Sequence, residues 1–306
     1  MLLLVIKKLL NTQWLRFKEN KVLQRAAVKI SLKEPRKKLM HMFEFLSNFG
    51  TRDIHLIHGA PKITSQQRRD IEEKLEKTAK DAINFGFNAH THIRCGHVPT
   101  SIIETAQEKK ADYIAIYWMP KSLFRNALFG NIDSDILRLS NLPVFIYNPG
   151  LFKSSVSMEQ VLYATDFKHT DAAVLPYLED RRFTASKLYL LHVGERAPDP
   201  ATEEIRRKRV LDNLHALAHE CAHAYDSVQP VETIGQARKQ IARQAAMLDI
   251  DLIVVGKSDK SDTVSQMLGS TAEILPHRAG RSVFIIPVFC RLPVSQNSKD
   301  SGYHEA

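Results

Sequence analysis

The sequence contains few cysteines and no long hydrophobic run, and each shortage argues against a class of protein. Its three cysteines, Cys95, Cys221 and Cys290, are far apart and form no CxxC motif. That pattern argues against a disulfide framework and favours a reducing compartment. No apolar run approaches the roughly 20 residues that a membrane-spanning helix requires. We therefore expect a cytoplasmic protein.

Common catalytic motifs are missing as well. The chain has no nucleophile elbow, no HExxH zinc motif and no Walker lysine. Nothing supplies an evident general base. We therefore consider enzymatic activity the minor interpretation.

Positive charge is in excess only near the beginning of the chain. The formal net charge is +9, and residues 1–40 carry this excess. The rest of the chain is balanced, so no broad basic face for nucleic acid is expected. Residues 1–21 form a basic amphipathic pattern, which suits the surface of an anionic membrane. We favour the alternative, in which this leader docks on the protein or is irregular.

The chain contains two copies of one pattern. The stretch ADYIAIYWMPKSLFRNALFGNIDSDILRLSNLPVFIYNP resembles DIDLIVVGKSDKSDTVSQMLGSTAEILPHRAGRSVFIIPV further along. Four pairs of residues recur at one constant spacing: Asp112 and Asp251, Gly130 and Gly269, Val144 and Val283, and Gly96 and Gly235. A constant spacing without gaps indicates a duplication.

Each copy alternates short apolar runs with amphipathic stretches. In the second copy we expect strands at 160–165, 187–193, 227–234, 251–256 and 282–288, and helices at 170–183, 202–225, 236–248 and from 270. Such alternation predicts a parallel sheet covered by helices on both faces. The expected parts of the chain are a leader at 1–21, domains at 22–150 and 151–290, and a disordered polar tail at 291–306.

A loop near the end of the second copy has features of an anion site. It reads VVGKSDKSDTVSQMLGSTAEI, and an apolar strand in it ends at Gly256. Parallel sheets bind ligands at the carboxyl ends of their strands. A helix that begins at Gly269, Ser270 and Thr271 would present free amides and hydroxyls there. The alternative is an ordinary turn followed by a helix with a serine cap.

The sequence resembles the universal stress protein family in its tandem form. The family motif is Gly, two residues, Gly, nine residues, Gly, then Ser or Thr. This chain has Gly256, then Asp259 in place of the second glycine, then Gly269 and Ser270. The segment ATDF, which contains Asp166, and the segment LLHV at 190–193 are further family marks. The resemblance implies two doubly wound, five-stranded parallel α/β domains of the Rossmann-like, adenine nucleotide alpha hydrolase-like kind.

The resemblance also implies a binding site for adenine nucleotide, ATP or AMP and ADP, with magnesium as a potential companion. Ten positions of the second copy would form it: Ala164, Thr165, Asp166, Val193, Gly256, Ser258, Asp259, Gly269, Ser270 and Thr271. Asp166 would hold the adenosine, and Val193 would pack on the base. Residues after the fourth strand and at the start of the next helix would hold the phosphates.

Asp259 departs from the motif and should weaken the binding of phosphate. A carboxylate at this position repels an anion and lacks the conformational freedom of glycine. Lys257 and Lys260 flank it and could offset its charge, as could magnesium. We therefore expect weak binding that favours AMP or ADP over ATP.

The first copy departs further from the motif. Tyr117 and Pro120 replace its first two glycines, Gly130 is followed by Asn131, and Ser31 falls near the position of the aspartate. Bulky Tyr117 would fill the crevice together with Trp118. We therefore expect this half to be a structural partner that has lost the nucleotide. A pocket redirected to an apolar ligand is the alternative.

The implied function is that of a nucleotide sensor or scaffold in the stress response. The alternatives are an interaction or small-ligand module with both nucleotide pockets inactive, and a weak ATP hydrolase. In the family the last strands, here 144–147 and 283–287, lie at sheet edges. An unpaired apolar edge invites a partner strand. We therefore expect the two halves to pair as an internal pseudo-dimer, with a homodimer as a further option.

Two groups of histidines are candidates for metal binding. His215, His219 and His223 recur every four residues near Cys221, and two such imidazoles can hold one metal ion. The segment HTHIRCGH at 90–97 reads as a strand with alternating faces. We favour a solvated or packing role for both groups, and no metal site is predicted.

Overall fold

The computed structural model describes residues 23–119, 132–151, 158–167, 169–179, 185–257 and 270–288. The leader expected at 1–21 and the tail expected at 291–306 lie outside these residues. All statements below concern the described part of the chain.

The two halves have the same order of elements. The first half consists of β1 (Arg25–Lys29), α2 (Arg36–Ser47), β2 (Asp53–Ala60), α3 (Ser65–Asn84), β3 (Asn88–Cys95), α4 (Val98–Glu108), β4 (Tyr113–Tyr117), α5 (Ile132–Leu139) and β5 (Val144–Tyr147). After a short 3-10 turn at Pro149–Leu151, the second half consists of β6 (Gln160–Thr165), α6 (His169–Leu178), β7 (Lys187–Gly194), α7 (Pro200–Cys221), β8 (Ser227–Ile234), α8 (Ala237–Met247), β9 (Leu252–Lys257), α9 (Ser270–Arg278) and β10 (Ser282–Pro287). The order confirms the predicted alternation of strands and helices.

Local sequence explains where the two longest helices begin. At α3, the Thr64 hydroxyl accepts from the Gln67 amide, and the Gln67 side chain accepts from the Thr64 amide, which forms a capping box. At α7, Asp199 accepts from the amide of Thr202, and Pro200 occupies the first turn.

Two predicted helix ends are wrong by several residues. The helix expected at 170–183 runs over His169–Leu178, and the helix expected at 202–225 runs over Pro200–Cys221. The second difference follows from the sheet, because the chain must leave α7 in time to place Ser227 beside Lys187. The early start of α7 follows from its proline, which favours the first helical turn.

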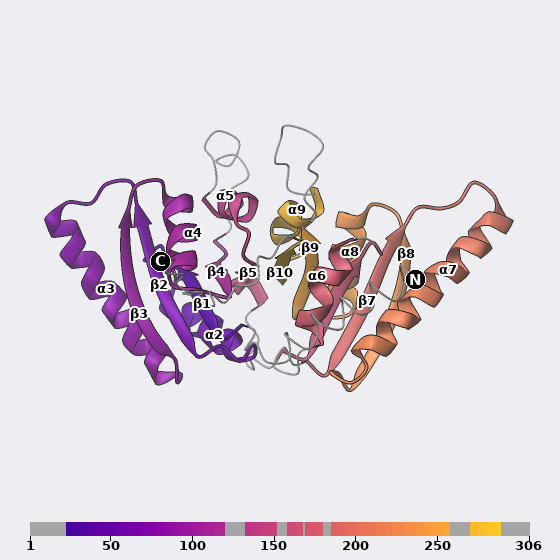
Figure 1. The fold of residues 1–306 in the computed structure, drawn as a ribbon, viewed down its shortest axis with the longest axis horizontal. Helices are drawn as coiled ribbons and strands as arrows, with labels where there is room; N and C mark the ends of the chain where they lie inside the picture. The colour runs from indigo at the N-terminus through magenta and orange to yellow at the C-terminus, as the bar shows by residue number, and fades with distance from the viewer. Residues whose placement is uncertain are drawn as a thin grey trace, which may run out of the picture.

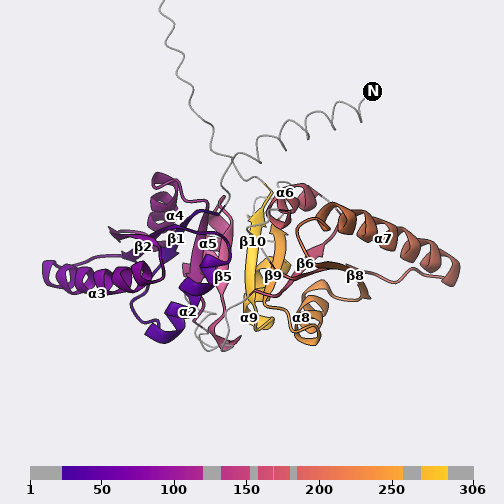
Figure 2. The same ribbon diagram turned by 90° about the horizontal axis from the view of Figure 1, so that it is seen from below.

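All ten strands form one sheet in the order β3-β2-β1-β4-β5-β10-β9-β6-β7-β8. Neighbouring strands are parallel within each half, and only β5 and β10 run antiparallel. Seen from below, these two strands lie side by side at the centre of the molecule (Figure 2). The predicted pairing of the two halves through their last strands is therefore confirmed.

The register of this joint shows the symmetry of the duplication. Phe145 pairs with Phe284, its own counterpart, while Val144 pairs with Ile285 and Ile146 with Val283. Exchange of the two halves therefore leaves the pattern of pairs unchanged, which means that a local twofold axis passes between Phe145 and Phe284. The two halves accordingly form a symmetric arrangement, with α3 and α7 at the outer ends and α5 and α9 beside the joint (Figure 1).

Two hydrophobic clusters, one on each face of the sheet, run through both halves. On the face covered by α2, α3, α6 and α7, aromatic rings surround the joint. The ring of Phe145 lies 5.0 Å from that of Phe49 and 5.4 Å from that of Phe45, and Phe284 lies 5.6 Å from Phe49. The halves thus share one core, which is the reason to treat them as a single packed body.

Paired residues of the duplication perform the same structural tasks. Asp112 accepts the backbone N–H of Arg25 at 2.8 Å, and Asp251 accepts that of Gln160 at 2.9 Å, so each carboxylate, placed just before the fourth strand of its half, holds the start of the first strand. Gly96 and Gly235 both adopt positive φ, 122° and 131°. A side chain rarely adopts that conformation, which explains glycine at both positions.

None of the helices in the described ranges is both long and apolar enough to cross a membrane.

Candidate functional site

The turn after β6 is held by the side chain of Thr165. Its hydroxyl donates to the carboxylate of Asp171, 2.8 Å from each oxygen, and accepts from the backbone N–H of Phe167 at 2.9 Å. His192 donates through Nδ1 to the carbonyl oxygen of Thr165 at 3.1 Å. These bonds fix the residues on both sides of Asp166, whose side chain remains exposed at the carboxyl edge of the sheet.

A buried hydrogen-bond network lies beneath this turn. The hydroxyl of Tyr163, which is fully buried, donates to Asp171 at 2.5 Å. Burial raises the pKa of Asp171, and the hydrogen bonds from Tyr163 and Thr165 oppose that shift. Burial also raises the pKa of Tyr163, as does the neighbouring carboxylate. Asp171 therefore supports the turn from inside and is not available to a ligand.

An aromatic pair covers the end of β7. Phe167 adopts φ of 56°, in the left-handed region that non-glycine residues rarely use. Its ring stacks on the imidazole of His192, with the ring centroids 4.5 Å apart and the planes 24° from parallel. The unusual backbone thus directs the Phe167 ring back onto the sheet.

Two predicted pocket positions lie on adjacent strands at this edge. Ala164 of β6 and Val193 of β7 are half-buried and pack against the cluster beneath α8 and α9. Both therefore face the same side of the sheet as the first turn of α9. The structure brings them together with Asp166 at the carboxyl edge, where doubly wound sheets bind their ligands.

Gly256 is required by a neighbouring side chain. A Cβ built on Gly256 would lie 2.8 Å from Cγ2 of Thr170 and would overlap that side chain. Thr170 is buried at the start of α6 and donates to Asp166 at 3.1 Å. The resemblance to the family implies that this glycine belongs to the nucleotide site. The packing of α6 on β9 is a sufficient reason for it.

The side chain of Lys257 extends to the other half of the molecule. Its ammonium donates to the carbonyl oxygens of Leu137 and Arg138, each at 2.9 Å, and of Ser140 at 3.3 Å. These carbonyls end α5, where the helix has unpaired acceptors and a negative dipole end. Lys257 was one of two lysines that could offset the charge of Asp259, and the structure places its ammonium at the end of α5.

The remaining predicted positions are only partly described. Ser258, Asp259 and Gly269 lie outside the described residues. The helix α9 begins at Ser270, as predicted, and Thr271 is half-buried in its first turn. The described part of the site therefore consists of the ends of β6, β7 and β9 and the start of α9.

At the corresponding place the first half contains a buried ion pair. The ammonium of Lys29 lies 2.5 Å from the carboxylate of Asp133, and both side chains are about nine-tenths buried. Lys29 pairs in register with Ile57 of β2 and Ile116 of β4, and Ala164 pairs in the same way with Leu191 of β7 and Val255 of β9. Lys29 and Ala164 therefore occupy corresponding positions of the two halves. Asp133 lies in the first turn of α5, where it is also favoured by the helix dipole.

Tyr117 and Trp118, the two aromatic residues expected to fill the crevice, lie on opposite faces of the sheet. Trp118 is 5% exposed and packs on the side of Lys29 and α5, whereas Tyr117 is 2% exposed and packs on the side of α2. The ring of Tyr117 lies 5.8 Å from that of Tyr147. Pro120, Gly130 and Asn131 lie outside the described residues.

The turn after β1 has the geometry of the turn after β6. Leu32 adopts φ of 65°, like Phe167, and Ser31 precedes it, as Asp166 precedes Phe167. His58 donates through Nδ1 to the carbonyl oxygen of Ile30 at 2.9 Å, as His192 does to Thr165. The backbone of the turn is therefore common to both halves, and only the side chains differ.

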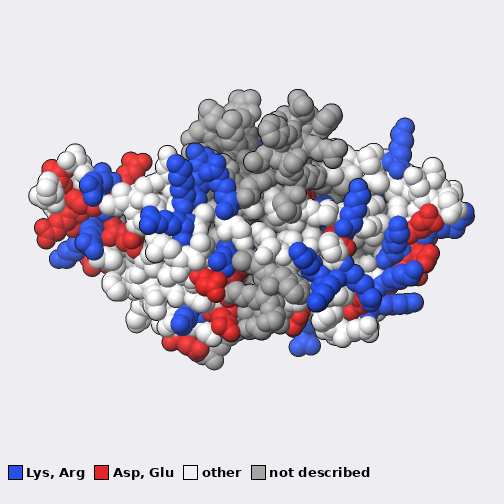
Figure 3. Space-filling model, turned by 180° about the vertical axis from the view of Figure 1, so that it is seen from behind, with Lys and Arg blue, Asp and Glu red and all other residues white. Residues whose placement is uncertain are grey.

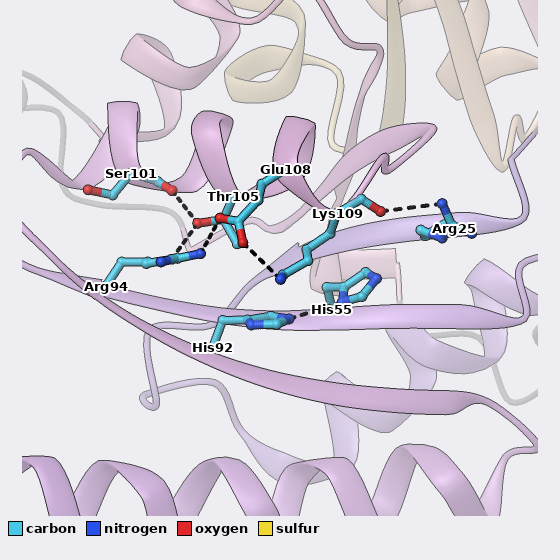
Figure 4. Close-up of polar contacts among 8 residues, drawn as sticks. All are labelled: Arg25, His55, His92, Arg94, Ser101, Thr105, Glu108 and Lys109. Carbon is cyan, nitrogen blue, oxygen red and sulfur yellow. Dashed lines mark hydrogen bonds and ion pairs between the residues drawn. The ribbon is translucent and has the colours of Figure 1, made fainter. Parts of the chain in front are cut away.

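The histidines of β3 lie beside a histidine of β2. Nδ1 of His55 and Nε2 of His92 are 3.0 Å apart. The ring of His90 stacks on that of His55, with the ring centroids 5.1 Å apart. Burial lowers the pKa of His55 to about 4, and His92 adds to the effect. Figure 4 shows the pair next to Arg25 and Lys109. Among the described residues, no group of three or more His, Cys, Asp or Glu side chains could hold a metal ion.

The histidines of α7 are solvated. His215 and His219 are exposed on the helix, and His223 is exposed just after it. Cys221 is fully buried, and burial raises the pKa of its thiol to about 12. It is therefore neither a reactive thiol nor a partner of the exposed imidazoles.

Sequence reasoning missed several residues that shape the site: Tyr163, Phe167, Thr170, Asp171 and His192. One signal was present, because LIHG and LLHV recur in the two copies and each contains the histidine that binds the preceding strand. The others act through contacts between separate elements, which no local pattern reveals.

Comparison with known proteins identifies the family of this chain. The model of the universal stress protein family matches twice, at residues 21–148 and 158–287. A universal stress protein of Methanocaldococcus jannaschii is 27% identical over 84 residues, which are 28% of this chain and 49% of that protein. This chain thus matches about half of the length of that relative.

Solved structures share the fold over most of the chain. A universal stress protein from Archaeoglobus fulgidus has a TM-score of 0.65 and 20% identity, with 88% of this chain and 98% of that one covered. A protein of unknown function from Pseudomonas aeruginosa PAO1 has a TM-score of 0.65 and 17% identity, with 86% and 92% covered. Since the family model matches both halves, the chain belongs to the universal stress protein family and has its tandem form.

Proposed function

We propose that the second half of this protein binds an adenine nucleotide and that the first half does not. The nucleotide would lie at the carboxyl edge of β6, β7 and β9, with Asp166 on the adenosine and the start of α9 near the phosphates. The protein would act as a nucleotide-responsive sensor or scaffold in the stress response. Catalysis is not part of the proposal, because no general base is evident at this edge.

One observation carries the asymmetry. Where the first half has the buried pair of Lys29 and Asp133, the second half has the small residues Ala164 and Ala272. In the first half a carboxylate of the chain itself occupies the first turn of α5, and a lysine fills the space beside it. A helix start without its own carboxylate at that position is better suited to an external anion.

Two features predict that the binding is weak. The packing of Thr170 against Gly256 limits the room beneath the phosphates. Lys257, which flanks the loop, is engaged by the carbonyls of α5. Together with the carboxylate of Asp259, these features favour a ligand with few phosphates. We therefore expect AMP or ADP to bind more tightly than ATP.

Calorimetric titration of the full chain with AMP tests the proposal. The double substitution Ala164→Lys and Ala272→Asp transfers the ion pair of the first half into the second half and should abolish binding. Asp166→Ala should weaken it at least tenfold. The matched control Ser31→Ala changes the same position of the first half and should leave binding unchanged. If Ser31→Ala weakens binding as much as Asp166→Ala, the proposed location is wrong.

A second candidate is an interaction module in which neither half binds a nucleotide. The packing of Thr170 favours it, because this packing explains Gly256 without any ligand. The same titration decides between the two. No heat of binding with AMP, ADP or ATP, with and without magnesium, would support the interaction module. Release of phosphate during the titration with ATP would support the weak hydrolase instead.

A further inference from the structure

A groove lies between α2 and α3 in the first half, away from the edge discussed above. Its volume is about 450 Å³, within the range of small-molecule sites. It opens on the face of the sheet covered by α2 and α3, whereas Ala164 and Val193 lie on the face covered by α8 and α9. The groove is therefore distinct from the proposed nucleotide site.

The floor of the groove is apolar. Ile30 and Leu39 are buried, and Leu32 and Met40 are half-buried and pack against the core. The two half-buried side chains leave aliphatic surface facing the groove. An apolar floor of this kind favours a ligand with a hydrocarbon body.

Leu32 is held in an unfavourable conformation at this floor. Its φ of 65° lies in the left-handed region, which leucine rarely adopts. The corresponding Phe167 has the same backbone, but its ring turns onto His192. Leu32 instead lines the groove. The left-handed backbone belongs to the turn that both halves share, and the first half differs in that the side chain of Leu32 is left to line the groove.

The rim of the groove is basic. Its lining includes four cationic side chains and two carboxylates. The cations are Arg36, Lys74, Lys77 and Lys80, and the carboxylates are Glu34 and Asp81. Figure 3 shows Lys and Arg side chains gathered over α2 and α3, in the right half of the view.

Four of the six charged side chains at the rim have partners within the protein. Arg36 forms two bonds with Asp81, at 2.6 and 2.7 Å, and Glu34 accepts the amides of Ser31 and Lys33. Lys77 pairs with Glu73, an exposed pair of little energetic value.

Two lysines of α3 remain for a ligand. Lys74 and Lys80 are exposed and form no ion pair within the described part of the chain. They lie on α3, beside an apolar floor that a hydrocarbon would cover. Their charge complements an anionic head group, and the floor complements the chain attached to it.

We propose that this groove binds an anionic amphiphile, a single alkyl chain that ends in a carboxylate or a phosphate. The chain would cover Leu32 and Met40, and the head group would contact Lys74 and Lys80. The first half would then bind a ligand of a different chemical class from that of the second half.

Titration of the full chain with decanoate, followed by calorimetry below the micelle concentration, tests the proposal. Decanoate should bind, whereas acetate and inorganic phosphate, which lack the chain, should not. Decyltrimethylammonium, which has the chain and the opposite charge, should bind at least tenfold more weakly. Anionic vesicles distinguish a free amphiphile from a membrane surface. Binding to vesicles without binding of decanoate would overturn the proposal.

Two variants locate the binding. Lys74→Gln combined with Lys80→Gln removes the free charges, and Leu32→Asn removes apolar surface while retaining a residue that tolerates the left-handed region. Each should weaken binding of decanoate at least tenfold. Lys208→Gln on the exposed face of α7 is the matched control and should have no effect. The proposal is overturned if wild-type protein does not bind decanoate, or if the control weakens binding as much as the variants do.

Discussion

Lys29 and Asp133 of the first half occupy the positions that Ala164 and Ala272 occupy in the second. The strands around them have the same register, and the helices that follow begin at corresponding places. One half thus supplies its own cation and anion at an edge where the other half has two methyl groups. The comparison shows that a duplicated fold can retain its framework while the chemistry of one edge is exchanged for internal packing.

The retained features are those that hold the backbone. Both halves have a left-handed residue after the first strand, and both use a histidine of the second strand to bind the carbonyl before it. Both also use an aspartate to start the first strand. The exchanged features are side chains that project beyond the strand ends, where they affect a ligand more than they affect the fold.

Removal of an aromatic ring at the joint should have the largest effect. Phe145 and Phe284 are fully buried counterparts that face each other across the joint. Phe284→Ala should lower the free energy of unfolding by about 3–5 kcal/mol, because it leaves a cavity in the shared core. Phe145→Ala should cost a similar amount, as symmetry requires. Urea unfolding measures both.

The control for the joint is Phe85→Ala, at a phenylalanine that is 43% exposed at the end of α3. It should change the free energy of unfolding by less than about 1 kcal/mol. If Phe284→Ala costs no more than this control, the halves are held together by other surfaces.

The buried ion pair of the first half should have the next largest effect. Asp133→Ala leaves the ammonium of Lys29 buried without a partner and should cost about 3–5 kcal/mol. Lys29→Ala together with Asp133→Ala reproduces the pair of alanines in the second half and should cost clearly less than the sum of the single substitutions. A double-mutant cycle by urea unfolding measures this coupling. Additive costs would show that the two charges do not depend on each other.

The two halves should respond to pH in opposite directions. Burial lowers the pKa of His55 to about 4, so between pH 6.5 and 4 only the unfolded chain binds this proton, and stability falls as the pH falls. Burial next to Glu220 raises the pKa of Glu179 to about 7, so between pH 4.5 and 7 only the folded chain binds this proton, and stability rises as the pH falls. Each effect amounts to about 3 kcal/mol.

Single substitutions should separate these opposing effects. His55 is surrounded by His92, His90, Arg25 and Lys109. His55→Gln should leave a protein that becomes more stable from pH 7 down to 4.5, while Glu179→Gln should leave one that becomes less stable from pH 6.5 down to 4. Unfolding curves at each pH measure the difference. Parallel pH profiles for both variants would contradict the assignment of these two groups.

The lysine between the halves should have the smallest effect. Lys257→Gln removes the charge from the carboxyl end of α5 and should cost about 1 kcal/mol. Hydrogen exchange should accelerate in α5 and remain unchanged in α8. Lys239→Gln, at an exposed lysine of α8, is the control. Unchanged exchange in α5 would show that the lysine contributes nothing to the cap.

Much of this fold could be predicted because the information is local and occurs twice. Continuous apolar runs identified the strands, and the repetition of Asp112 and Gly96 at Asp251 and Gly235 identified the duplication. The pairing of β5 with β10 followed from the resemblance to the family, which places these apolar strands at sheet edges.

The details of the site could not be predicted, because they depend on contacts between distant elements. Nothing in the sequence near Lys29 indicates Asp133 as its partner, and nothing near Lys257 indicates the end of α5. The close contact of Thr170 with Gly256 explains why residue 256 must be glycine, and the family motif does not reveal this contact.

Equilibrium dialysis of the full chain against labelled AMP is the most direct test of the central asymmetry. We predict one bound nucleotide per chain at saturation, lost in the Asp166→Ala variant and retained in the Ser31→Ala variant. Two bound nucleotides per chain, or one that survives Asp166→Ala, would contradict the account.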